Sequence, residues 1–553
     1  MALFAELRRR NVLKVALLYA VACWLIIWFV GVVQAEVSVP VWTDAFMYFV
    51  LAVGYPAALW FAWTYEFTPG GLKKAADVDQ TQSIVYKTGQ KLNSAVAVLL
   101  VLGVIAVFGQ RLLPTFEFLV PGTPEGDAPL SSRVPADIRS LTLDNGLKII
   151  VWPDHDIPNV VMHNYVRAGG RNEYPGITGL SHFFEHMMFL GTSNLEPGEF
   201  DRTMEAAGGA NNAYTTPDIT VYTDRFPVSA LETIFEIEAD RFQNLEIYEE
   251  VVESERQVVY SERRSGVDND NSSKLYEQMR ATAFIAHPYQ FPVIGWPSDI
   301  ESWTEEQLRS YYETYYAPNN RTIVIVGDVT PKELFGLAEE YFAPIPAQGP
   351  PPEVTTVEPT QAGERRIVVE APAQTPLLHI AFHAFNASDP QTLPLNLLLN
   401  ILASGDSSRL HRALVEDESI ALSVGAWLDE GFDPGLAYFY LALPPGGDLA
   451  AAERRVIEEL MWVIADGVSE PELQKARNIM LADYWRSLAT IAGKAGLVGD
   501  YEVFHGNYEK LFNLPATLGL VTVDDLRDVA ARVFDANNMT VGVLRATDED
   551  DAP

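Results

Sequence analysis

The chain has 553 residues, with 74 acidic against 39 basic side chains, a net charge of −35 and a pI near 4.6. This length exceeds that of one ordinary domain. So acidic a chain is a poor partner for a phosphate backbone, and we expect no nucleic-acid binding. Its single cysteine, Cys23, excludes an internal disulfide and a cysteine-based metal cage. Any metal must therefore be held by histidine and carboxylate.

Three apolar runs in the first 113 residues approach the length of membrane-spanning helices: 15–33, 45–65 and, less clearly, 92–109. A cleaved signal peptide is the competing interpretation of the first run, because basic residues precede it and Ala35 follows it. The run is long for a signal peptide, and two further apolar segments follow. We therefore predict a membrane module with three transmembrane helices over residues 1–113.

The basic residues of this module predict its orientation. They lie before the first run and between the second and third runs, at Arg8, Arg9, Arg10, Lys14, Lys73, Lys74, Lys87 and Lys91. Cytoplasmic loops carry the excess of lysine and arginine, so the N-terminus is predicted to be cytoplasmic. Three spans then place the residues after Arg111 outside. In a bacterium with two membranes, this is a multi-pass inner-membrane protein with a periplasmic soluble part.

The soluble part is predicted to contain two mixed α/β domains. A linker at 114–137 precedes the first domain, 138–342. This domain has a hairpin with an Asn145-Gly146 turn, strands at 159–169 and 321–329, and helices in the 180s and from about 231 to 264.

A second, proline-rich linker covers 343–364, after which the order of elements restarts. Strands at 365–372 and 377–385 precede a helix at 394–405, and an acidic tail at 546–553 follows the second domain, 365–545. The predicted fold class is α+β, with two homologous mixed α/β sandwich domains after about three transmembrane helices. The helix at 394–405 has Leu and Asn in place of the histidines of the first domain, so only that domain is predicted to hold a metal.

Those histidines, His182 and His186, are four positions apart in GLSHFFEHMMFLGT, residues 179–192. On a helix they share one face, so both imidazoles can reach one ion. Glu185 lies between them, close enough to accept a proton from a water at that ion. A single histidine on an amphipathic helix is usually only a hydrogen-bonded polar residue. Two histidines and a glutamate among apolar neighbours need a partner, and His-x-x-Glu-His is an inverted zinc motif.

Zinc held by two histidines needs a third protein ligand, usually a carboxylate, and leaves a fourth position for water. EEVVESERQVVYSERR, residues 249–264, supplies candidates. Glu255 and Glu262 are seven apart and share a helical face. The alternative is a solvated acidic helix, and spacing alone does not choose among its carboxylates.

Several segments together resemble the pitrilysin family, which includes insulin-degrading enzyme and the mitochondrial processing peptidase. In chain order they are GLSHFFEHMMFLGT, GGANNAYTTPDITVYTDRFP, ESERQVVYSERR, HPYQFPVIGWPSDI and YYAPNNRTIVIVGDV. The similarity runs from about Arg139 to Leu544, and GDSSRL and GVSEPELQKARN in the second half also resemble bacterial members.

The resemblance implies one zinc ion per chain, and His182, His186 and Glu262 match its ligands. Glu185 matches the general base, and Glu255 a supporting glutamate that orients a ligand or the water. The stretch Gly209 to Thr215, with Asn212-Ala213, resembles the family's edge strand, to which a peptide substrate adds as a further strand. The implied reaction is hydrolysis of an internal peptide bond.

The sequence departs from the family in one respect. Active members close a chamber from four such domains, and an Arg and a Tyr seven residues apart help to hold substrate. This chain supplies two domains, and Val415 and Leu422 stand at the positions that correspond to the Arg and the Tyr. We therefore expect either a second pitrilysin-like subunit that supplies Arg and Tyr, or a homodimer with altered specificity.

The leading function is a membrane-anchored zinc metalloendopeptidase acting on peptides or short unfolded segments on the periplasmic side. The alternative is a non-catalytic scaffold or binding subunit of a heteromeric complex, because the family contains such members. Inert members typically lose a ligand or the base. All four matching residues are present here, which favours the enzyme.

Overall fold

The computed structural model describes residues 134–547, Tyr55, residues 65–68 and residues 71–74. The chain divides into two compact units, Met1–Asp127 and Ala128–Pro553. In the first unit, β1 (Tyr65–Thr68) and β2 (Gly71–Lys74) form an antiparallel hairpin. The predicted membrane spans lie outside the described residues apart from Tyr55 and Tyr65. No helix among the described residues is long and apolar enough to cross a bilayer.

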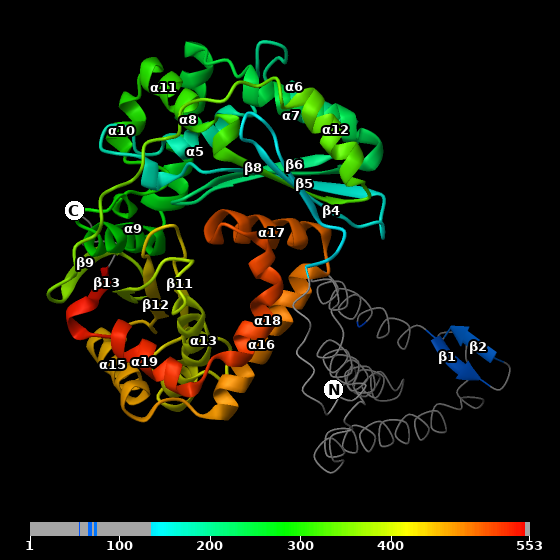
Figure 1. Ribbon diagram of the computed structural model, residues 1–553. Coiled ribbons are helices and arrows are strands. Elements are labelled where there is room, and N and C mark those ends of the chain that lie inside the picture. Colours follow the sequence, from blue (N-terminus) through cyan, green and yellow to red (C-terminus); the bar gives the residue numbers. More distant parts are fainter. Residues whose placement is uncertain (1–54, 56–64, 69–70, 75–133, 548–553) are drawn as a thin grey trace. The chain divides into compact units, whose positions relative to one another are not determined.

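The first half of the second unit is built on a six-stranded mixed sheet of order β3-β4-β8-β5-β7-β6 (Figure 1). Its strands are β3 (Arg139–Thr142), β4 (Lys148–Pro153), β5 (Asn159–Val166), β6 (Ala210–Thr215), β7 (Thr220–Pro227) and β8 (Arg321–Gly327). Strands β4 and β8 are parallel, and the other pairs are antiparallel. The predicted hairpin is confirmed, because Thr142 of β3 pairs with Lys148 of β4. The strand β6 lies at the edge of the sheet.

The helices of this half confirm most of the predicted pattern. They are α5 (Leu180–Met187), α6 (Glu199–Ala206), α7 (Leu231–Gln243), α8 (Glu249–Arg263), α9 (Asn271–Ala283), α10 (Pro297–Ser302), α11 (Glu305–Tyr315) and α12 (Pro331–Tyr341). The prediction of one helical region from about 231 to 264 is wrong in one respect, because the structure has two helices there, α7 and α8. The chain leaves the helix after Gln243, and Leu245 then pairs with Thr192 in an isolated β-bridge.

The second half repeats this design on a five-stranded sheet of order β11-β12-β10-β13-β9. The strands are β9 (Arg365–Pro372), β10 (Leu377–His383), β11 (Ser423–Leu428), β12 (Leu436–Ala442) and β13 (Met539–Thr547). The helices are α13 (Thr392–Ala403), α14 (Arg409–His411), α15 (Leu449–Asp466), α16 (Glu470–Leu488), α17 (Ile491–His505), α18 (Leu514–Leu520) and α19 (Val523–Val533). The predicted restart of strand, strand and helix is confirmed. The predicted acidic tail begins two residues too early, because β13 stays paired with β9 through Thr547.

Each half lends a helix to the sheet of the other (Figure 1). Side chains of a strand alternate between faces, so Ile149 and Val151 of β4 pack with α7 and α12, whereas Ile150 packs with α17 from the second half. Reciprocally, Leu275 and Met279 of α9 pack on β10, β12 and β13 of the second sheet. Because burial of apolar surface drives folding, neither half completes its core alone. The two halves therefore form one structural unit.

Candidate metal centre

The helix α5 presents two histidines and a glutamate away from its apolar face. Four side chains at positions i, i+3, i+4 and i+7 are fully buried against α8, α10 and α11: Leu180, Phe183, Phe184 and Met187. This pattern is that of an amphipathic helix with one apolar face. It leaves His182, Glu185 and His186 on the opposite side. The local sequence therefore both forms the helix and directs the three polar groups to one place.

Buried polar contacts fix the start of α5. The carboxylate of Glu173, 3% exposed, accepts the backbone N–H groups of Gly179 and Ser181, both at 2.7 Å. These N–H groups belong to the first turn and have no partner within the helix. Burial raises the pKa of Glu173 to about 7. Gly179 has φ 90°, and a Cβ there would lie 2.6 Å from the carbonyl oxygen of Ile294, so only glycine allows this close packing.

The helix α8 brings two carboxylates to the histidines. Its Glu255 Oε1 lies 2.7 Å from His186 Nδ1. Two helical turns further along the same face, Glu262 Oε2 lies 3.4 Å from His186 Nε2 and 3.7 Å from His182 Nε2. The structure therefore brings His182, His186, Glu255 and Glu262 together. It also gives the two glutamates different positions, which their spacing alone did not predict.

The donor set fits a zinc ion. Ligand atoms of His182, His186 and Glu262 all lie within 4.8 Å of one another. Two ligands at the usual zinc bond lengths of about 2.0–2.1 Å in a tetrahedral site are separated by roughly 3.3 Å, close to the Nε2–Oε2 distances here. When His186 donates its Nδ1–H to Glu255, its Nε2 keeps a lone pair for the metal. Two imidazoles and one carboxylate leave a fourth position open, as in catalytic zinc sites.

The electrostatics of the cluster favour a positive charge at its centre. Burial, with His186 nearby, lowers the pKa of His182 to about 4. Burial has the same effect on His186, but the hydrogen bonds of Glu255 and Glu262 outweigh it and raise the pKa of His186 to about 9. The hydrogen bond with His186 lowers the pKa of Glu262. A bound cation supplies the same positive charge to these carboxylates.

Glu185 is hydrogen-bonded to a residue of the edge strand. Thr215 at the end of β6 donates its Oγ1–H to Glu185 Oε2 at 2.6 Å, and burial raises the pKa of Glu185. The sequence places Thr215 at the end of the expected edge strand but predicts no contact with Glu185. The period of two along a strand offered the signal, since Ala213 and Thr215 share a face and Ala213 packs beside α5. Asn212 and Ala213 lie in β6, which has no partner strand on its outer side among the described residues.

We expect Glu255→Gln to weaken metal binding by about 10–100-fold, the usual cost of losing a carboxylate that orients a ligating histidine. The amide holds His186 Nδ1 less strongly than the carboxylate does, because the acceptor loses its charge. Metal affinity is measured by competition with a coloured chelator. Glu253→Gln on the same helix is the matched control, because Glu253 is exposed and, among the described residues, pairs only with Arg256 and Gln257. Equal affinities for the two variants would contradict the orienting role.

Comparison with known proteins gives several matches. "Insulinase (Peptidase family M16)" matches residues 153–295, and "Peptidase M16 inactive domain" matches residues 302–480. Zinc protease PqqE of Helicobacter pylori is 29% identical over 414 residues, covering 73% of this chain and 92% of that protein. The crystal structure of a protease from Helicobacter pylori has a TM-score of 0.72 at 28% identity and covers 74% of this chain and 99% of that one. The periplasmic protease PqqL of Escherichia coli has the same fold, with a TM-score of 0.64 at 19% identity, and the match covers 75% of this chain and 48% of that one.

Proposed function

Because this chain belongs to the M16 peptidases, the family of the pitrilysins and insulinases, we propose that it is a zinc-dependent endopeptidase acting on peptides or short unfolded segments. The observation that carries the proposal is the cluster of His182, His186 and Glu262 with Glu185 beside it. One zinc ion per chain, when bound, polarises the scissile carbonyl and makes a water easier to deprotonate.

The residues of the chain divide the remaining work. His182, His186 and Glu262 hold the ion, and Glu255 orients His186. Glu185 accepts a proton from the attacking water and passes it to the leaving amine, and its burial favours this proton uptake. A substrate that pairs with the free edge of β6 gains main-chain hydrogen bonds with little demand on its sequence. This suits an enzyme for unfolded segments.

Removal of the metal tests this function. We expect the full-length chain to cleave an unstructured peptide mixture, to lose this activity with a chelator and to regain it with zinc. Glu185→Gln, carried through the same purification, controls for a contaminating protease. Cleavage that resists the chelator, or that persists in Glu185→Gln, would contradict the mechanism. Zinc binding without cleavage by the isolated chain would support the alternative of a non-catalytic binding subunit.

We also propose that the complete enzyme contains a second M16-like subunit or a second copy of this chain. Leu422 is 57% exposed, and Val415 packs against the hydrophobic core of the second half. Both side chains are aliphatic, so neither offers a polar group to substrate. The chain corresponds in fold to about half of PqqL. A different subunit supplying Arg and Tyr restores the missing pair, whereas a homodimer does not. Recovery of this chain alone from native membranes would exclude the heteromeric form.

The same proposal places the protein in a bacterial inner membrane, with its N-terminus cytoplasmic and its catalytic domains periplasmic. The support comes from the sequence, namely the apolar runs before residue 113 and the basic residues that flank them. A periplasmic reporter enzyme fused after residue 113 should be active. Activity of the same reporter fused within residues 73–91 would contradict this orientation.

A further inference from the structure

The turn between β6 and β7 is held from both halves of the unit. Its Asp218 is 3% exposed. The hydroxyl of Tyr289 lies 2.7 and 2.9 Å from the two Asp218 oxygens, and Arg171 lies 3.4 Å from one of them. From the second half, the backbone N–H of Phe432 donates to the same carboxylate at 3.2 Å. The turn is thus contacted by a loop from the second half, which contributes no residue to the candidate zinc site.

That loop, residues 429–435 between β11 and β12, is shaped for this contact. A Cβ at Gly431 would overlap the Tyr289 hydroxyl and an Asp218 oxygen, so the approach requires glycine. Asp433 accepts from Arg171 Nε at 3.0 Å and lies 3.1 Å from His287 Nε2. Its backbone N–H donates to the Tyr289 hydroxyl at 3.2 Å. Phe432 and Asp433 of the second half are therefore bonded to the first half at this point, and Gly431 packs closely against it.

The first half also fixes the turn through backbone hydrogen bonds. Arg171 donates its backbone N–H to the carbonyl of Pro217 at 2.7 Å, and Thr216 donates its own to Ile219 at 2.8 Å. Immediately before the turn, Thr215 holds Glu185. Since β6 has β7 as its only partner strand among the described residues, the turn at its end is a main determinant of its position.

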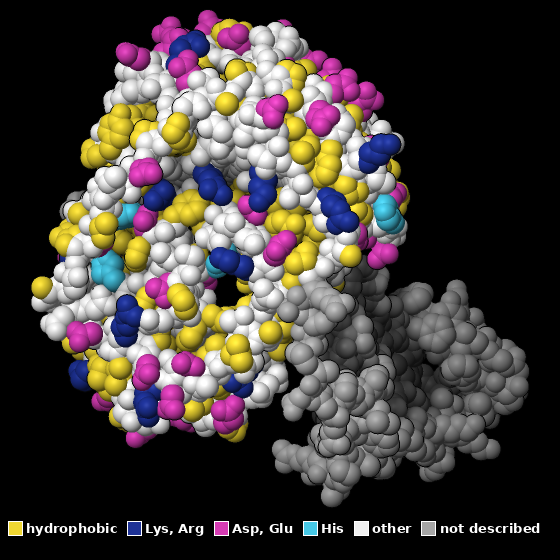
Figure 2. All heavy atoms as spheres, viewed as in Figure 1, with side chains coloured by type: hydrophobic (Ala, Val, Ile, Leu, Met, Phe, Trp, Pro, Cys, Tyr) yellow, Lys and Arg dark blue, Asp and Glu magenta, His cyan; other side chains and the backbone are white. Residues whose placement is uncertain are grey.

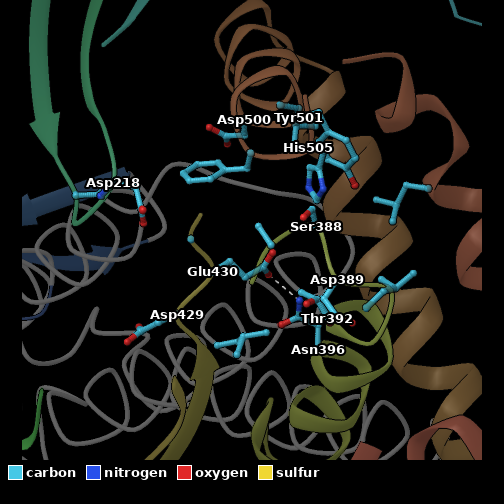
Figure 3. Close-up of a pocket in the computed structure, with 18 of the residues that line it drawn as sticks. Asp218, Ser388, Asp389, Thr392, Asn396, Asp429, Glu430, Asp500, Tyr501 and His505 are labelled. Atoms are coloured by element: carbon cyan, nitrogen blue, oxygen red, sulfur yellow. Dashed lines mark hydrogen bonds between the residues drawn. The ribbon is translucent and has the colours of Figure 1, made fainter. Parts of the chain in front are cut away.

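A cavity of about 1020 Å³ opens beside this turn. Tyr214 and Asp218 line it from the first half, and Glu430, Asp500 and His505 from the second. Figure 3 shows Asp218 and Glu430 on different sides of the space, with Asp500 and His505 projecting from α17. Figure 2 shows the surface hollowed between the halves. Tyr214 and Thr216 at the end of β6 line this cavity, so a peptide that paired with β6 and extended past Thr215 would reach it.

We propose that the β11–β12 loop of the second half positions the substrate strand, acting through Gly431, Asp433 and the Asp218 carboxylate. This inference rests on the proposed peptidase function and gives the second half a role in it. The loop contacts neither α5 nor α8 through these bonds, so it governs peptide binding and leaves metal binding unaffected. A peptide that pairs with β6 is held by main-chain hydrogen bonds, so a modest shift of β6 is sufficient to weaken its binding.

The test is Asp433→Ala in the full-length chain, with Glu472→Ala as the matched control. Glu472 also binds an arginine through Nε and Nη2, that of Arg409, but wholly within the second half. It additionally accepts from Ser469 at the start of α16. The control therefore loses at least as many contacts as the test variant. Gly431→Ala is the second test variant, because it changes no charge.

Hydrogen exchange and peptide kinetics are measured on the same preparations. We expect both test variants to exchange faster over residues 210–219 and unchanged over 180–187. Their zinc content should stay that of the wild type, and KM should rise in both while kcat changes less. In Asp433→Ala we expect a rise of roughly tenfold, since this variant loses a charged hydrogen bond. The control should alter neither KM nor exchange at 210–219.

The outcomes separate this inference from the function on which it rests. Wild-type protein that cleaves no peptide would count against the proposed function, whereas exchange over 210–219 still reports whether the loop holds the turn. Unchanged exchange and KM in Asp433→Ala and Gly431→Ala would overturn the positioning role. Equal effects in Glu472→Ala would overturn it as well, because the change would then reflect general stability.

Discussion

Glu185→Gln is expected to reduce peptide hydrolysis by at least about 10²–10⁴-fold, the usual contribution of a positioned general base, while zinc binding stays intact. Glutamine has the same size and still accepts from Thr215, but its neutral amide takes no proton. Glu185 lies outside the cluster of His182, His186 and Glu262, so the metal ligands are unaffected. Activity and metal content should therefore separate completely in this variant.

The measurement is kcat on an unstructured peptide, together with zinc per chain by elemental analysis. Thr215→Val is the informative companion, because it removes the 2.6 Å hydrogen bond to Glu185 and keeps the shape of the side chain. We expect an intermediate loss of kcat, since the base is present and less well oriented. A Glu185→Gln protein within tenfold of the wild-type rate would show that another group accepts the proton.

The parts of the site that were predictable are those set by local geometry. A helical period of 3.6 residues is sufficient to place His182 and His186 on one face. The roles of Glu255 and Glu262 were not predictable from spacing, because both lie on the same face of α8. What separates them is how α8 packs against α5, which directs one carboxylate to Nδ1 of His186 and the other towards the Nε2 atoms.

The same distinction applies to the fold. Alternating and apolar runs predicted β5 and β8, and the Asn145-Gly146 turn predicted the first hairpin. The exchange of α9 and α17 between the sheets has no such signal, because an amphipathic helix does not encode which sheet it covers. Nor does sequence separation show that Asp433 meets Arg171, 262 positions earlier. These features depend on tertiary packing.

Loss of a ligand is the second large effect. We expect His182→Ala and Glu262→Gln each to fall from one zinc per chain to nearly none after dialysis, and to lose hydrolysis with it. The loss of affinity should exceed the roughly 10–100-fold expected for Glu255→Gln, because a bond to the ion disappears instead of an orienting contact. Zinc content measured beside a thermal melt separates metal loss from unfolding, since each variant should melt like zinc-free wild-type protein.

The order of the glutamate variants is the decisive comparison. Glu262 is half-exposed and contacts both imidazoles, whereas Glu255 is mostly buried and contacts His186 Nδ1. If Glu262 is the ligand, Glu262→Gln loses more zinc than Glu255→Gln. The reverse order, or stoichiometric zinc in Glu262→Gln, would require α8 to present Glu255 to the ion. His186 would then have to bind through Nδ1, so the imidazole ring would have to turn over.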